Sequence, residues 1–426
     1  MNNRLAETRS SLGNIGVLLM LYLSFRLLML LAYQPILTEQ GEVGIGAGGD
    51  RLFHFRLAAL SDEGKLPFRD WWSEFPPIWP VISTAVYLLL GENVNYSNWS
   101  VVLGMLMLAC ETGNLLLVRG IGCRLYSEST GASLAWVYAL SIAPAIFMWW
   151  NFDSMMNFFV LIGIYYLINA RDSRAAVAIA VGILVKFVPA LVFGAVIRYR
   201  RPTTVIRFAT LSAILVILAY LPLFVINQEL TTISLRAQAE KPSSQTIWAL
   251  LDGNYSTGNI ATVEDRLKQP DQVVNGGGNE ARISNGLRLA IAAGLGIVIF
   301  VTTRRFDDRG LILFVGVTVL IFYLQAQAWS PQWATLIIPL TLLAFPSVRG
   351  VMATIVLSSL AVAEYPVLWS RTGDLDPSGQ MGGEWFLPWA LIVLMRTGLL
   401  AGLALAFYKA LREHAAAPDM NERPTQ

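Results

Sequence analysis

Long apolar runs recur along this chain from residue 12 to residue 408, and they constrain its fold more than any other feature of the sequence. Several of them approach the ~20 residues that an α-helix needs to span a bilayer. Charged residues make up 14% of the chain, whereas soluble domains carry roughly 25%. The short alternating segments of a membrane β-barrel are not seen. The sequence therefore predicts an all-α polytopic membrane protein with about 10 to 13 transmembrane helices.

The candidate membrane segments are 12–33, 76–91, 99–118, 132–150, 155–170, 175–197, 208–227, 286–303, 309–328, 333–346, 350–368 and 386–408. The first is too long for the core of a signal peptide and lacks a small-residue cleavage site, so we expect a retained membrane helix. The segments predict a single membrane domain over residues 1–426. Two long polar stretches, 34–75 and 228–285, interrupt it, and the polar tail 409–426 is expected to be disordered.

Clusters of basic residues predict the orientation of the chain. The clusters "RYRRPTTVIR" (198–207) and "RRFDDR" (304–309) are expected in the cytoplasm, because cytoplasmic loops are enriched in Lys and Arg. One helix, the stretch 228–285 and a second helix lie between these clusters. This order places 228–285 on the extracytoplasmic side, together with 34–75.

The basic residues earlier in the chain do not fit a simple alternation. Arg119 and Arg171 also predict cytoplasmic loops, yet alternation from the N-terminus cannot place both inside together with Arg198. We therefore expect that segment 76–91, or the two halves of 175–197 on either side of a proline, re-enter the membrane without spanning it.

The first polar stretch contains "DRLFHFRLAALSDEG" (50–64), whose apolar residues fall at 52, 53, 55, 57, 58 and 60. This spacing predicts a helix along the membrane surface. Asp50 follows two glycines and suits the N-cap of this helix, and Gly64 suits its end.

The next stretch, "KLPFRDWWSEFPPIWP" (65–80), ends in a proline pair that suits the start of another helix. Its tryptophans suit anchors at the membrane interface: Trp71, Trp72 and Trp79. Anchoring does not explain Asp70 and Glu74 beside them, because acidic groups next to an apolar interface need hydration, a charged or hydrogen-bonding partner, or a functional role.

Five stretches of the chain, taken in order, carry a resemblance to a known family. The first is Asp50, a surface helix and "GKLPFRDWWSEFPP" (64–77) before a hydrophobic helix. The others are "NFDSMMNFFVLIGIYYL" (151–167), "GILVKFVPALVF" (182–193), "AEKPSSQTIWALL" (239–251) and "QAWSPQWATLIIPL" (327–340). Together they resemble the GT-C-fold glycosyltransferases, and among these the bacterial polyprenyl-phosphate-dependent sugar transferases, including mannosyltransferase-like proteins.

The last four stretches are similar to the family motifs Q-F-D-x-x-P, K-x-x-P, R-P-x-x-x-S-x-W and S-P-Q-Y, and the resemblance covers residues 10–345. This chain departs from them at a few positions: Lys241 stands where Arg is usual, Met155 and Met156 where small residues and Pro are usual, and Trp333 where Tyr is usual. None of these changes removes a charged group, so they bear on the substrate more than on the reaction class.

The resemblance implies a GT-C-like helical bundle whose extracytoplasmic loops carry short surface helices. It implies an inverting transfer of a sugar, with mannose favoured, from a polyprenyl-phosphate donor to a hydroxyl of a lipid or glycan acceptor. The reaction would take place at the outer face of a bacterial plasma membrane, among membrane lipids, and without a cofactor.

Such a transfer needs a general base for the acceptor hydroxyl. The resemblance assigns this role to Asp50, and a helix N-cap is its alternative role. Asp70, Glu74 and Asp153 are the other candidate bases, and Asp153 suits equally the N-cap of the helix over 155–170.

Cations must hold the departing phosphate, where negative charge develops. Lys186 lies inside an apolar run, where a lysine is costly unless it snorkels, pairs or faces a polar cavity. Arg236 and Lys241 are candidates from the second long stretch, with ordinary solvated charge as the alternative. Arg69 is a weaker candidate.

Three further residues are candidates for substrate binding. The segment "SPQW" (330–333) is predicted to end one helix and begin the next, so Ser330 and Gln332 are candidate partners of the sugar or phosphate, or of local backbone. His54 lies four residues after Asp50 and shares its helix face, although packing at the membrane surface explains it as well.

Glu111 is expected to pair with Arg119 or another cation.

Other partners and activities are less consistent with the sequence. We expect no metal site, because the carboxylates do not cluster along the chain, and no nucleic-acid partner, because the net charge is only +2. A monomer is expected. The alternative functions are a lipid-linked sugar transporter or flippase, which would favour internal repeats and broken helices at midplane, and a glycan polymerase or ligase.

Overall fold

The computed structural model describes residues 13–33, 36–38, 41–43, 50–149, 151–256, 262–268, 278–369 and 381–413. The glycines before Asp50 and the tail beyond Glu413 lie outside these residues. Within them, six helices are long and apolar enough to cross a membrane: α5 (Tyr96–Leu125), α11 (Pro202–Ile226), α15 (Asn285–Thr302), α16 (Asp308–Gln325), Val348–Leu368 and Gly383–Arg412. This confirms the prediction of an all-α polytopic membrane protein.

The last two of these six spans are each built from two elements. Val348–Leu368 joins α18 (Val348–Val362) to η6 (Ala363–Leu368), and Gly383–Arg412 joins η8 (Gly383–Trp385) to α19 (Phe386–Arg412). The helix α19 therefore carries the first residues of the tail that the sequence predicts to be disordered.

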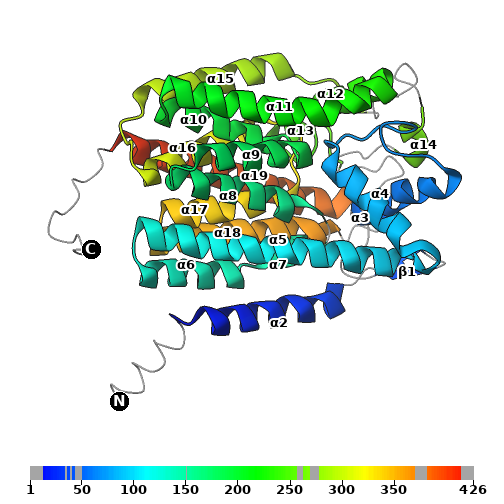
Figure 1. The fold of residues 1–426 in the computed structure, drawn as a ribbon, viewed down its shortest axis with the longest axis horizontal. Helices are drawn as coiled ribbons and strands as arrows, with labels where there is room; N and C mark the ends of the chain where they lie inside the picture. The colour runs from blue at the N-terminus through cyan, green and yellow to red at the C-terminus, as the bar shows by residue number, and fades with distance from the viewer. Residues whose placement is uncertain are drawn as a thin grey trace.

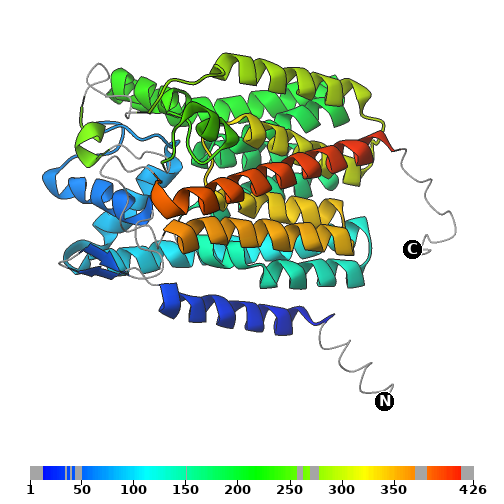
Figure 2. The same cartoon turned by 180° about the vertical axis from the view of Figure 1, so that it is seen from behind.

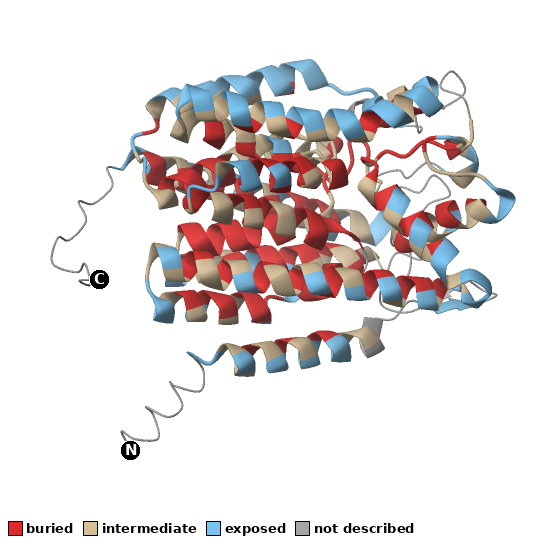
Figure 3. Ribbon diagram, in the orientation of Figure 1, coloured by how far each residue is buried: buried red, intermediate tan, exposed pale blue. Residues whose placement is uncertain are grey.

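Shorter helices complete the bundle. They are α2 (Ile15–Tyr33), α6 (Glu128–Leu140), α7 (Ile142–Phe147), α8 (Asp153–Ile168), α9 (Asp172–Val185), η3 (Val188–Leu191), α10 (Val192–Tyr199), η5 (Pro331–Trp333) and α17 (Ala334–Ala344). Every residue of α17 is buried, so this helix lies in the middle of the bundle. By contrast, only 11% of the spans in α11 and α15 is buried, and Figure 3 shows their exposed outer faces. These faces suit contact with lipid.

The bundle has two distinct ends (Figures 1 and 2). At one end α2 begins and α19 ends. At the other lie the short helices α3 (Asp50–Ala59), α4 (Ile78–Leu90), α12 (Gln228–Glu240) and α14 (Val263–Arg266), with the antiparallel hairpin of β1 (Ile36–Thr38) and β2 (Gly41–Val43). We call this second end the loop end.

The segment 175–197 is two helices and not one. The helix α9 stops at Val185, the backbone of Lys186 is extended (φ −159°, ψ 145°), and η3 begins with Pro189 in its first turn. The chain then returns, because Arg200 pairs with Asp172 at 2.7 Å between Nε and Oδ1. This turn explains how the basic loops at Arg171 and Arg198 share one end of the bundle. The candidate segment 76–91 forms α4, which packs on α3 at the loop end.

The two long polar stretches fold together. The indole Nε1 of Trp72 donates to the Asp265 carbonyl at 3.1 Å, and the amide of Ser73 donates to Ser234 Oγ at 3.2 Å. Trp71, Trp72 and Trp79 are between 1% and 4% exposed. The expectation that these tryptophans anchor the protein in the membrane interface is therefore wrong, since packing inside the protein buries them, and Trp79 stacks on Phe152.

Two local predictions are confirmed. The surface helix α3 continues through η1 (Leu60–Glu63) and ends at Gly64, whose φ of +72° is a left-handed conformation that glycine adopts without strain. Pro331 occupies the first turn of η5, which leads directly into α17, so the "SPQW" segment does begin a helix, although the preceding helix α16 already ends at Gln325.

Candidate active site

A cavity of about 530 Å³ lies at the loop end, where both long stretches meet the helix ends. Its charged lining residues are Asp50, Glu74, Lys186 and Lys241. Its amide lining residues are Asn151, Gln245, Asn285, Gln325, Gln327 and Gln332. The remaining lining is mostly aromatic or aliphatic. Residues far apart in the sequence thus line one cavity that has both polar and apolar parts.

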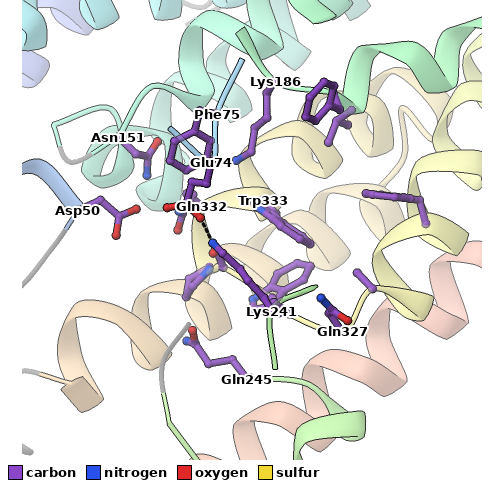
Figure 4. Close-up of a pocket in the computed structure, with 18 of the residues that line it drawn as sticks. Asp50, Glu74, Phe75, Asn151, Lys186, Lys241, Gln245, Gln327, Gln332 and Trp333 are labelled. Atoms are coloured by element: carbon purple, nitrogen blue, oxygen red, sulfur yellow. Dashed lines mark ion pairs between the residues drawn. The ribbon is translucent and has the colours of Figure 1, made fainter. Parts of the chain in front are cut away.

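Asp50 is the first residue of α3, and its carboxylate points into the cavity (Figure 4). Within the described part of the chain, this carboxylate caps no backbone amide and pairs with no cation. Burial raises the pKa of the Asp50 carboxyl above its ordinary value, the charges of Lys241 and Lys186 oppose the rise, and the charge of Asp153 adds to it.

Lys186 enters the cavity from the break between α9 and η3. Its Nζ lies 2.9 Å and 3.1 Å from the two carboxylate oxygens of Asp153, the first residue of α8. The same Nζ lies 5.7 Å from the ring centroid of Phe152 and 5.6 Å from that of Trp333. The pairing satisfies a buried lysine, because a charge in an apolar bundle needs a counterion.

Glu74 joins two cations of the second long stretch. Its carboxylate pairs with Lys241, as the dashed line in Figure 4 marks, and with Arg266 at 3.1 Å. Glu74 is 3% exposed and Arg266 is 1% exposed. Burial and the Arg266 charge lower the pKa of Lys241 to about 7, against the raising effect of Asp50. The trio carries one positive charge in excess when Lys241 is protonated.

The "SPQW" segment forms another part of the cavity wall. Ser330, Gln332 and Trp333 all line the cavity. The ring of Trp333 stacks on Tyr323, with centroids 4.7 Å apart and planes at 25°. This stacking fixes the indole beside the Lys186 ammonium.

The apolar part of the lining comes from α12, α15, α16 and the chain at the start of η3. It includes Phe187, Val188, Leu235, Leu289 and Phe322. The cavity therefore has a charged and amide-rich part and a part that suits a hydrocarbon chain.

Five of the candidate site residues lie outside the cavity lining, and one of them, Asp153, reaches it only through its ion pair with Lys186. Asp70 and Arg69 pair with each other at 2.7 Å on the surface, and Arg236 is exposed on α12. His54 is enclosed by the rings of Phe53, Phe75, Trp79 and Phe152. Burial and the charges of Arg266 and Arg51 lower the pKa of His54 to about 3, so the imidazole is neutral.

Glu111 also has different partners from those expected. It accepts hydrogen bonds from Tyr138 Oη at 2.5 Å and from Asn114 Nδ2 at 3.0 Å. Arg119 pairs instead with Glu128 at 3.6 Å. The expected pair of Glu111 with Arg119 is therefore wrong.

Sequence reasoning missed several members of the site. Arg266 gave no signal, since it is one of many loop cations, and its importance follows only from its contact with Glu74. Asn151 did carry a signal, because it stands where the Q-F-D motif has Gln. Gln245 and Gln327 lie inside two of the quoted stretches, but at positions that the family motifs do not specify. Among the described residues, no three His, Cys, Asp or Glu side chains gather closely enough to hold a metal ion.

Comparison with known proteins finds a similar fold among solved structures only. No family model and no curated protein matches the chain. Among solved structures, the fold is similar to the crystal structure of ArnT from Cupriavidus metallidurans bound to undecaprenyl phosphate. That similarity has a TM-score of 0.49 and 13% sequence identity, and covers 93% of this chain and 76% of that chain.

Proposed function

We propose that this chain is a membrane glycosyltransferase of the GT-C type, which transfers a sugar from a polyprenyl-phosphate donor to a hydroxyl acceptor. The observation that carries the proposal is the cavity itself. In this cavity, the Asp50 carboxylate faces Lys186 and Lys241 and forms no ion pair with a described residue. The space between them continues into an apolar part of the lining. The motifs that resemble that family supply the residues of this cavity.

Asp50 is the proposed general base. It takes the proton of the acceptor hydroxyl while the acceptor oxygen forms a bond to the anomeric carbon of the sugar. The bond from that carbon to the phosphate oxygen breaks, its electron pair goes to the phosphate, and polyprenyl phosphate leaves. One displacement of this kind inverts the anomeric centre. A partly buried carboxylate whose pKa is raised by desolvation suits proton removal.

Lys186 and Lys241 are the proposed partners of the departing phosphate. Each is a cation already in place where negative charge develops, and the surrounding protein lowers the local dielectric. Asp153 and Glu74 are proposed to orient these lysines, since each carboxylate is bound to a lysine in the structure. The apolar lining around Leu289 and Phe322 suits the first isoprene units of the donor.

The sugar itself is proposed to be a neutral hexose, with mannose favoured. Amide side chains such as Gln332 and Gln325 donate and accept hydrogen bonds with sugar hydroxyls, and the indole of Trp333 offers a flat apolar face beside them. We propose that the loop end faces the extracytoplasmic side, where a lipid or glycan acceptor can approach.

The test is a transfer assay on purified protein in nanodiscs, with short-chain polyprenyl-phosphate mannose and other polyprenyl-phosphate sugars as donors. We expect the wild type to transfer sugar to a lipid extract. Asp50→Asn should bind donor as well as the wild type and lose roughly 10²–10⁴-fold in turnover, because only proton removal is affected.

The matched control is Asp70→Asn, an acidic residue of the same loop that lies outside the cavity and pairs with Arg69. It should keep the turnover of the wild type. Equal turnover in wild type and Asp50→Asn would exclude Asp50 as the base. Absence of transfer from every donor by the wild type would contradict the glycosyltransferase proposal.

A further inference from the structure

A second pair of charges lies buried beside the cavity, in helices that carry no motif of the proposed function. Glu364, in η6, is 0% exposed, and Arg396, in α19, is 2% exposed. Arg396 Nη1 donates to Glu364 Oε2. Burying two charges inside apolar helices costs several kcal/mol per ion in desolvation, so the pair needs a role beyond stability. An ionisable residue within a membrane helix is by default a functional candidate.

Both members of the pair bind the same residue of the second long stretch. Gln245 Nε2 donates to Glu364 Oε1 at 3.2 Å, and Arg396 Nη2 donates to the Gln245 carbonyl. Gln245 lines the cavity and has a φ of +54°. A left-handed backbone is uncommon for a residue other than glycine and persists only where its surroundings determine it. The Glu364–Arg396 pair supplies such surroundings.

The neighbours of Gln245 connect this pair to the "SPQW" wall. The amide of Ser244 donates to the Gln327 carbonyl at 3.1 Å, and the amide of Trp329 donates to the Ser244 carbonyl at 3.0 Å. The guanidinium of Arg396 lies over the Trp329 ring, 4.6 Å from its centroid. One guanidinium therefore contacts both chain segments that form this side of the cavity.

We propose that Glu364 and Arg396 are positioning residues, which set the spacing between Lys241 and the wall formed by Gln332 and Trp333. Lys241 lies four residues before Gln245, and Gln332 and Trp333 lie three and four residues after Trp329. The pair fixes Gln245 and Trp329 relative to each other, and so it fixes the phosphate-binding lysine relative to the sugar-binding wall. This inference rests on the proposed function, and neither residue lines the cavity or touches the substrate.

The test replaces the whole pair with apolar residues of similar length, Glu364→Met with Arg396→Met. Such replacement of a buried ion pair is often neutral for stability, so the thermal midpoint should stay near that of the wild type. The kcat/KM for polyprenyl-phosphate mannose should fall by about 10²-fold, the loss that a misplacement of ~1 Å produces. Amide hydrogen exchange at 242–249 should become faster, while exchange in α17 should not change.

Two single variants keep the test decisive if the double variant does not fold. Glu364→Gln keeps the shape and one acceptor. Arg396→Lys keeps the charge, but one ammonium cannot replace a planar guanidinium that binds Glu364 and Gln245 together and stacks on Trp329. Both should fold, and Arg396→Lys should lose more kcat/KM than Glu364→Gln.

The matched control removes an ion pair at the opposite end of the bundle, Asp172→Asn with Arg200→Gln, whose Oδ1 and Nε lie 2.7 Å apart. It should keep the kcat/KM of the wild type. Wild-type kcat/KM in the folded Met–Met variant would overturn the inference, as would faster exchange spread over the whole bundle. If the wild type transfers no sugar, the proposed function fails, and exchange at 242–249 still decides whether the pair orders this segment.

Discussion

At the scale of single residues, the site depends on which lysine or arginine pairs with each carboxylate. The Glu74 carboxylate forms ion pairs with both Lys241 and Arg266, whereas Lys186 forms an ion pair with Asp153. Asp50 has no such partner among the described residues, which leaves its oxygens available to a substrate hydroxyl. The site therefore contains carboxylate–cation pairs and one further carboxylate, that of Asp50, which is available for the proposed proton removal.

The pKa directions at the site predict a bell-shaped dependence of kcat/KM on pH. Asp50 must be unprotonated, so activity is lost as the pH falls through a pKa that burial raises above the ordinary aspartate value. Lys241 must be protonated, so activity is also lost as the pH rises through about 7. Because kcat/KM reports the free enzyme, the profile should be measured at low donor concentration.

The variant Lys241→Arg tests whether Lys241 is the group whose deprotonation lowers kcat/KM at high pH. An arginine stays charged over the whole range, so the loss on the alkaline side should move to higher pH while the acid side stays in place. If the alkaline side were unchanged, the group that titrates there would not be Lys241.

At the scale of elements, small residues set how closely helices approach. The helices α5 and α6 cross at Gly122 and Gly131. A Cβ on Gly131 would lie 2.6 Å from the backbone N of Cys123 and 2.7 Å from the carbonyl O of Arg119. These are backbone atoms of a packed helix, which cannot move aside as a flexible side chain does.

Gly131→Ala is therefore expected to destabilise the protein by about 1–3 kcal/mol, the usual cost of overpacking a core. Thermal unfolding in detergent, followed by loss of solubility, measures this. Gly296→Ala on α15 is the matched control, since a Cβ there meets nothing within 4 Å. Equal midpoints for both variants would mean that the α5–α6 crossing tolerates a methyl group.

At the scale of the whole molecule, the bundle separates its two ends. At the end opposite the cavity, Tyr199 Oη donates to the Arg305 carbonyl at 2.8 Å and Tyr126 Oη donates to the Leu343 carbonyl at 2.7 Å. At the loop end, the two long stretches close over the cavity. The basic loops of the first end fit the cytoplasmic side.

This separation predicts labelling from opposite faces of the membrane. In a background with Cys110→Ser and Cys123→Ser, Arg236→Cys should react with an impermeant maleimide added to intact cells, because Arg236 is exposed at the loop end. Arg349→Cys, exposed in the first turn of α18, should react only after permeabilisation. The reverse pattern would place the cavity on the cytoplasmic side.

Hydropathy by itself determined the helical class and most spans, because the apolar content of a segment decides whether it enters a bilayer. Proline and glycine chemistry determined the ends at Gly64 and Pro331, since both act on the local backbone. The resemblance of five motifs selected Asp50 and Lys186, both of which line the cavity.

Only the tertiary structure decided the partners of these residues. Lys186 meets Asp153 across 33 positions of sequence, Arg266 meets Glu74 across 192, and Arg396 meets Glu364 across 32. It also buried the tryptophans of the first loop and left Asp70 outside the cavity. Periodicity and turn signals act over a few residues, whereas the pairing of charges depends on which distant segments pack together.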